Sequence, residues 1–135
     1  MTVQWSTSVR NTILAGWEVG IGASAKIEFR TGVQPENTAA AAVGTLVATF
    51  ALEPDWADAP TGGSVSMSGL PLASIATGNG TIGHYRITDS AGTTCHEQGS
   101  VSATGGGGDL TVNNPAVTSG QSIQITSWSK TAPGA

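Results

Sequence analysis

The segment Ile82–Ala103 constrains the fold most strongly, because it has the pattern of two β-strands joined by a turn at Ser90–Thr93. Polar and apolar residues alternate from His84 to Thr88, which predicts a strand with one buried face. Ile82 is out of phase with this alternation. The glycine that follows it, Gly83, predicts a β-bulge at that point.

The second arm of this hairpin has Cys95 and Val101 as its apolar anchors, so Cys95 is expected to face the core. Gly99 between them indicates a bulge or a close approach of another group to the backbone. His84 and His96 flank the turn, but adjacent strand residues point to opposite faces, and a metal site needs three or four converging ligands. We therefore expect structural roles for these residues, with no metal and no cofactor.

The N-terminal segment predicts a short helix. An N-cap is available at Ser6 or Thr7, and Gly20 and Gly22 are expected to end the helix. Apolar residues follow the cap at helical spacing: Val9, Ile13, Leu14 and Trp17. A helix of this length is unstable alone, so its apolar stripe is expected to dock on the sheet or on a neighbouring molecule, with Gly16 allowing close approach.

The rest of the chain predicts further short strands separated by turn signals, at residues 25–31, 44–52, 64–70, 110–112 and 122–129. The segment 44–52 is expected to be buried on both faces. In the last strand, Trp128 falls on the opposite face from Ile123 and Ile125 unless the strand bulges. Together these patterns predict a mainly β fold, an antiparallel β-sandwich or jelly roll with one short N-terminal helix. We expect one domain over residues 1–135, with the arm and helix at about 1–22 and the β domain at about 24–130.

The low charge of the chain excludes some functions. Charged residues are 10 % of the sequence, and the five basic ones are scattered, whereas nucleic-acid binding needs a cluster of them. One cysteine permits no internal disulfide. No apolar run is long enough to span a bilayer, and no signal-peptide pattern is present. We expect assembly in the cytoplasm, with part of this weakly charged surface covered by a partner.

No pattern in the sequence specifies a reaction. The nine acidic residues include no marked pair of catalytic carboxylates. Asp89 and Asp109 are expected at turns, where an aspartate caps its own backbone. The run Gly105–Gly108 lacks the lysine and the following helix of a phosphate-binding loop, so it predicts a flexible turn or a close approach of a neighbouring chain. We expect no enzymatic activity.

The four tryptophans leave two interpretations open. Exposed tryptophans on one face of a β-sandwich stack on sugar rings, which is typical of carbohydrate-binding modules. Tryptophan is also enriched in cores and at subunit interfaces. The sugar-binding interpretation requires two exposed tryptophans on one face, whereas the interface interpretation requires presence in a large assembly.

The sequence resembles a family of small virion proteins of tailed bacteriophages along essentially its whole length. The resemblance lies in MTVQWSTSVRN at the start, KIEFRTG, GHYRITDSAGTTCHEQGSVSATGGGGDLTVNN in the middle and ITSWSKTA near the end. It implies a capsid decoration (cement) protein on the exterior of the virion, bound to the major capsid protein and to sister copies as a dimer or trimer. A component of the tail or fibre base is the alternative. Such proteins have no diagnostic site, so no binding residue follows from the resemblance.

Two segments are the candidate contacts to the capsid or to sister copies. The first is the N-terminal arm and helix, and the second is the loop that breaks the strand at 44–52. The candidate interface residues are Trp5, Val9, Ile13, Trp17, Pro54, Asp55 and Trp56.

Overall fold

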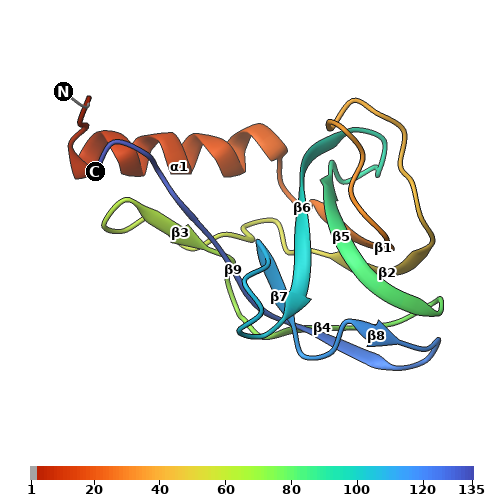
Figure 1. Ribbon diagram of the computed structural model, residues 1–135. Coiled ribbons are helices and arrows are strands. Elements are labelled where there is room, and N and C mark those ends of the chain that lie inside the picture. The colour runs from red at the N-terminus through yellow and green to blue at the C-terminus, as the bar shows by residue number, and fades with distance from the viewer. Residues whose placement is uncertain (1–2) are drawn as a thin grey trace.

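The computed structural model describes residues 3–135, in which one curled β-sheet carries one helix along its side (Figure 1). Residues 1 and 2 of the expected N-terminal arm lie outside the described residues. The expectation of a mainly β fold with one N-terminal helix is confirmed. The strands form a single sheet that bends into a half-barrel, where a sandwich or jelly roll would stack two sheets.

The helix and strands follow one another in the order of their labels. They are α1 (Thr7–Ile21), β1 (Lys26–Thr31), β2 (Leu46–Ala51), β3 (Ser64–Ser66), β4 (Leu72–Ile75), β5 (Gly80–Thr88), β6 (Cys95–Ala103), β7 (Leu110–Val112), β8 (Ala116–Val117) and β9 (Ser122–Thr131).

The sheet has the strand order β2-β1-β5-β6-β7-β9-β3, with β4 also paired to β9 and β8 to β5. Its curl brings β4 back beside β2. The backbone N–H groups of Thr77 and Gly78 both donate to the carbonyl of Val47, at 2.8 and 3.2 Å. The Ser74 hydroxyl donates to the carbonyl of Thr49 at 3.0 Å. We call this junction between β2 and β4 the seam.

The helix begins as the sequence predicts, because the Ser6 side chain accepts a hydrogen bond from the backbone N–H of Val9. Its buried stripe, however, differs from the predicted one. The residues that face the sheet are Arg10, Leu14, Trp17 and Ile21, whereas Val9 and Ile13 are exposed. Gly16 faces open space, so the close approach expected there is absent.

Arg10 can occupy the buried stripe because a backbone carbonyl accepts hydrogen bonds from its guanidinium. Its guanidinium donates twice to the carbonyl of Ala132, at 3.1 and 2.9 Å, and lies against Gly63. The backbone N–H of Ala132 in turn donates to the carbonyl of Gly63. The start of α1 is thereby joined to the C-terminal tail and to the turn before β3.

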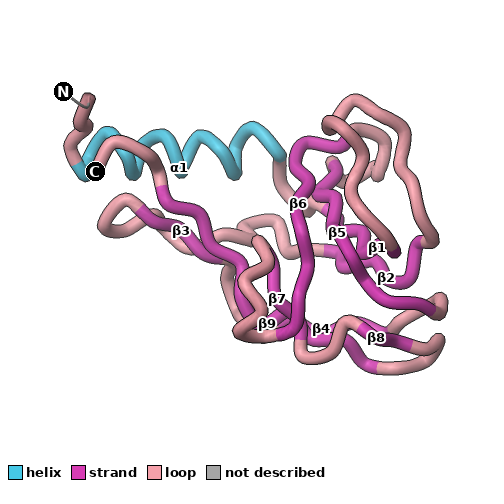
Figure 2. The backbone as a smooth tube through the Cα atoms, viewed as in Figure 1, coloured by secondary structure: helices cyan, strands magenta, loops and turns pink. Residues whose placement is uncertain are grey.

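Strand β5 is buried on both faces, so the prediction of one buried face is wrong. His84, Arg86 and Thr88 are as enclosed as Tyr85 and Ile87. The outer face is covered by the loop between β1 and β2, which Figure 2 shows in pink beside β5. We call residues 32–45 the covering loop.

Arg86 holds the covering loop in place. Its guanidinium donates to the carbonyls of Thr38 and Ala40, at 3.1 and 3.0 Å, and to the Gln98 side chain at 3.0 Å. Gln98 donates onward to the carbonyl of Pro35 at 2.7 Å. A buried charge is costly unless it is fully hydrogen-bonded, and here the loop carbonyls provide the acceptors.

The glycine run after β6 makes an unusual parallel connection possible. Parallel neighbours usually need a crossover of about a dozen residues, yet β6 and β7 pair in parallel across residues 104–109. A Cβ atom at Gly106 or Gly108 would lie 2.8 Å from the Ser102 hydroxyl. The sequence analysis expected a flexible turn or a neighbouring chain here, whereas the close approach is made by the preceding strand of the same chain.

The predicted bulge at Gly83 is confirmed, and a second bulge decides the position of Trp128, which the sequence left open. The pairing of β1 with β5 shifts between Arg30 and Thr31, which leaves Gly83 as the bulged residue. The pairing of β7 with β9 shifts between Thr111 and Val112. This second bulge turns Trp128 to the same buried side as the isoleucines of β9.

Strand β2 is exposed on one face, contrary to the prediction for residues 44–52. Leu46, Thr49 and Ala51 are open to solvent, while Val47 and Phe50 are buried. The reason is its position, because β2 is an end of the strand order and only the seam covers its free edge.

Candidate functional site

Three of the four tryptophans form one internal cluster between α1 and the sheet. The Trp17 ring stacks on Trp128 with a centroid separation of 4.5 Å. Trp56 meets both rings edge-on, at 6.0 Å from Trp17 and 5.6 Å from Trp128. Its indole N–H donates to the carbonyl of Gly22 at 2.9 Å. These contacts dock the helix on the sheet.

The positions of Trp17 and Trp56 in this cluster do not fit the interface role that the sequence predicts for them. Trp56 is only 2 % exposed, so its side chain belongs to the core and presents no surface to a partner. Trp17 is partly buried and gives one face of its ring to Trp128. The sequence pattern missed this because the proline before Trp56 indicates a surface loop, while the chain after the proline turns inward beneath α1.

A polar group lies beside the tryptophan cluster and centres on Glu97. This carboxylate accepts hydrogen bonds from the Tyr85 hydroxyl at 2.6 Å and the Trp128 indole at 3.3 Å, and pairs with Lys130 at 3.3 Å. Burial raises the pKa of Tyr85, and the Glu97 charge raises it further. One oxygen of Glu97, Oε2, makes all three of these contacts, so this group ties β5, β6 and β9 together and stabilises the fold.

Trp5, Val9 and Ile13 remain as surface candidates, with exposed fractions of 43, 48 and 43 %. The backbone N–H of Trp5 donates to the carbonyl of Gly134 at 2.7 Å, and its ring lies against that glycine. Val9 and Ile13 lie one turn apart on the same face of α1. No element covers the outer side of α1 in Figure 1. We call these three residues the helix face.

Pro54 and Asp55 are exposed in the loop after β2, as predicted, and Asp55 contacts Glu18 of α1. Glu18 accepts hydrogen bonds from the backbone N–H groups of Trp56 and Ala57, at 3.1 and 3.2 Å. Burial raises the pKa of the Glu18 carboxyl above its ordinary 4.5, and the neighbouring Asp55 carboxyl adds to this, against the lowering effect of the two backbone groups.

This carboxyl pair predicts a pH-dependent effect of Asp55→Asn. A raised pKa means that folded Glu18 binds its proton more tightly than unfolded Glu18. The contribution of Glu18 to the free energy of unfolding therefore falls as the pH rises above 4.5. Asp55→Asn is expected to raise the free energy of unfolding at pH 7 by a few tenths of a kcal/mol, a value kept small by solvent screening. The gain should vanish near pH 3, as measured by urea unfolding. A gain that persists there, or an equal gain from Glu36→Gln on the covering loop, contradicts this account.

The hairpin residues considered for chemistry are separated. His84 is buried with Nδ1 at 2.8 Å from the carbonyl of Gly32, while His96 is exposed. Cys95 pairs with Thr88 on the side of the covering loop and is half-buried, so the expectation that it faces the core is wrong. Burial raises the pKa of its thiol. Among residues 3–135, no three His, Cys, Asp or Glu side chains gather as metal ligands do.

The two turn aspartates behave differently from each other. Asp89 caps its own turn, as expected, by accepting from the backbone N–H and hydroxyl of Thr93, which lowers its pKa. Asp109 instead reaches across to the previous strand and accepts from the backbone N–H and hydroxyl of Ser100, both at 3.0 Å. The backbone hydrogen bond lowers the pKa of Asp109. Both carboxylates stabilise turns.

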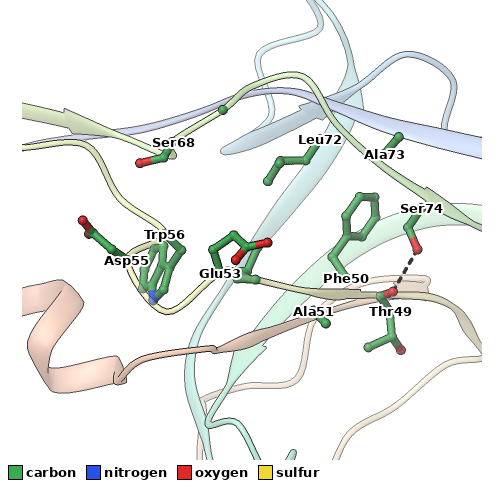
Figure 3. Close-up of a pocket in the computed structure, with 12 residues that line it drawn as sticks. Thr49, Phe50, Ala51, Glu53, Asp55, Trp56, Ser68, Leu72, Ala73 and Ser74 are labelled. Carbon is green, nitrogen blue, oxygen red and sulfur yellow. Dashed lines mark hydrogen bonds between the residues drawn. The ribbon is translucent and has the colours of Figure 1, made fainter.

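The seam contains a cleft that the sequence analysis did not predict. It has a volume of about 470 Å³ and opens where β2 and the start of β4 diverge. In Figure 3, Phe50 and Leu72 face it from the two strands, and the Ser74–Thr49 hydrogen bond closes one end. No single sequence signal marks it, because its walls come from segments about twenty residues apart whose meeting depends on the curl of the whole sheet.

Comparison with known proteins gives no relative: the chain matches no family model, no curated protein and no solved structure. Within the described part of the chain, no helix is long and apolar enough to cross a membrane.

Proposed function

We propose that this chain is a non-enzymatic structural protein of a tailed-phage particle, a capsid decoration protein on the outer shell. In this role it bridges copies of the major capsid protein and contacts sister copies as a dimer or trimer. The sequence resemblance suggests the particle. The observation that carries the proposal is the helix face, because Val9 and Ile13 remain exposed although the fold has its own complete core on the other side of α1.

The physical basis of such a role is interface burial repeated over many sites. A small apolar face binds weakly on its own, but contacts repeated across a shell stabilise the assembly as a whole. The fold suits this use, because the segment before β3 covers its free edge. The backbone N–H of Asp58 donates to the carbonyl of Ser66, and the backbone N–H of Ser68, just after β3, donates to the carbonyl of Trp56. A covered edge limits unwanted pairing between the copies.

A role at the tail or fibre base uses the same surface and differs in location and copy number. The carbohydrate-binding alternative needs two exposed tryptophans on one face. The structure has Trp5 exposed, Trp17 partly buried, and Trp56 and Trp128 buried, so that requirement is not met.

The test is occupancy on particles of a Val9→Gln, Ile13→Gln double variant. Both side chains are more than 40 % exposed, so the domain is expected to keep its unfolding temperature while its occupancy falls several-fold. Val19→Gln is the matched control, since Val19 is 80 % exposed on another face of the same helix. Quantitative mass spectrometry of purified particles measures both. Full occupancy of the double variant would show that the helix face is not the contact.

A further inference from the structure

The seam cleft combines an apolar floor with an acidic rim. Its walls include Phe50, Leu52, Trp56 and Leu72, and its rim carries Glu53 and Asp55. Figure 3 places Asp55 at the end of the cleft away from the Ser74–Thr49 hydrogen bond, and Glu53 between these two ends. Its volume of about 470 Å³ lies in the range of ligand-binding pockets.

The wall formed by β2 is a free strand edge. Leu52 donates to the carbonyl of Ala25, so Leu52, Phe50 and Ala48 point their backbone groups toward β1. The direction of the backbone N–H and C=O groups alternates along an antiparallel strand. The backbone groups of Thr49 and Ala51 therefore point into the seam. Within residues 3–135, β1 is the one strand that pairs with β2, so no strand is paired along the edge at Thr49 and Ala51.

The wall formed by β4 has the same property. Ala76 donates to the carbonyl of Gln121, which fixes Ser74 and Leu72 as the residues bonded to β9. Ala73 between them points its backbone groups toward β2, and in the described part of the chain β4 pairs with no strand on that side. Two strand edges thus face each other across the cleft, joined only beyond Thr49.

The charge of the cleft selects the occupant. Its lining residues include two carboxylates and no basic side chain. Glu18 contacts Asp55 and adds a further carboxyl group near the cleft. Binding in the cleft therefore favours a segment that carries a lysine or arginine beside small apolar side chains.

Among residues 3–135, no basic residue lies in a free extended segment that a second copy could offer. Arg10 and Arg86 are buried and bonded to carbonyls, and Arg30 pairs with Glu28. Lys130 pairs with Glu97, and Lys26 lies within the sheet, paired to β2 and β5. The occupant is therefore a different chain.

We propose that the seam cleft binds an extended, basic segment of a partner protein, which adds as a strand to the free edge of β2 at Thr49–Ala51. Backbone hydrogen bonds to Ala51 give affinity, the floor at Phe50 and Leu72 takes an apolar side chain, and Glu53 selects a basic one. This inference concerns a surface away from the helix face and does not depend on the proposed function.

The test uses the full chain and a synthetic peptide, blocked at both ends, in which valine alternates with arginine and threonine. The comparison peptides replace arginine by glutamate or carry N-methyl groups on alternate amides. Fluorescence anisotropy measures binding, and hydrogen–deuterium exchange locates it. The variants are Glu53→Lys, and Glu36→Lys as a matched charge reversal on the covering loop, away from the cleft.

We expect the arginine peptide to bind and to protect the amides of Thr49, Ala51 and Ala73. Glu53→Lys should weaken it by about tenfold, and Glu36→Lys should leave it unchanged. The glutamate and N-methylated peptides should bind less tightly than the arginine peptide. Absence of binding, equal binding of the glutamate peptide or protection confined to other strands would overturn the inference. So would a dimer of the free protein that Glu53→Lys dissociates, because a second copy would then fill the cleft. The particle-occupancy test of the Val9→Gln, Ile13→Gln variant is independent of these experiments, so the two proposals can fail separately.

Discussion

Trp56→Ala is expected to destabilise the domain by about 3–5 kcal/mol, the usual cost of removing a buried aromatic side chain. Trp56 is 2 % exposed and contacts both Trp17 and Trp128, so the variant leaves a cavity at the base of α1. It also leaves the carbonyl of Gly22 without its donor. For a chain of this size, the unfolding temperature should fall by about 10–15 °C in a calorimetric scan.

Trp5→Ala is the matched control, because Trp5 is 43 % exposed and its backbone hydrogen bond to Gly134 does not use the side chain. Its expected loss is below about 1 kcal/mol. If Trp56→Ala yields no folded protein, Trp56→Phe keeps much of the ring volume and should give an intermediate loss. An unfolding temperature of Trp56→Ala equal to that of Trp5→Ala would show that Trp56 lies outside the core.

Arg86→Met is expected to lower the free energy of unfolding by about 2–4 kcal/mol, since it removes three hydrogen bonds from a buried charged group. Methionine approximates the volume of the side chain but bonds to neither Thr38 nor Ala40. The covering loop should then detach, and its amides should exchange with solvent faster than those of β5. Hydrogen–deuterium exchange measures this directly.

Arg30→Met is the control for Arg86→Met, because Arg30 lies on the neighbouring strand β1 and bonds to the covering loop through one long hydrogen bond, to the carbonyl of Gly44 at 3.4 Å. Arg30 also makes a partly exposed pair with Glu28. Such pairs contribute about 0–1 kcal/mol. Equal losses from the two substitutions, or unchanged exchange of the covering loop in Arg86→Met, would mean that Arg86 does not hold the loop.

Local signals in the sequence predicted local structure well. The bulge at Gly83 and an N-cap at Ser6 or Thr7 each follow from a few neighbouring residues, and the structure uses Ser6. The face of Trp128 was left open, and a bulge in the pairing of β7 with β9 decides it. The phase of α1 was mispredicted because an arginine is normally taken as outward-facing. Arg10 instead buries its stem and bonds to the tail at Ala132.

Features that depend on distant segments were not predictable from the sequence. The parallel return from β6 to β7 needs Gly106 and Gly108 beside Ser102, a contact that no spacing rule encodes. The seam cleft likewise exists only because the sheet curls until β4 meets β2. Among the candidate interface residues, Val9 and Ile13 lie on the surface as the interface prediction requires, whereas Trp56 does not.

Cryo-electron microscopy of native phage particles that contain this chain tests the central proposal most directly. The account predicts density for the half-barrel on the outer shell, in many copies, with Trp5, Val9 and Ile13 against capsid subunits or sister copies. Density confined to the tail would move the protein to the tail or fibre base. Density on the shell with the helix face turned to solvent, or none on the particle, would contradict the proposed role of that face.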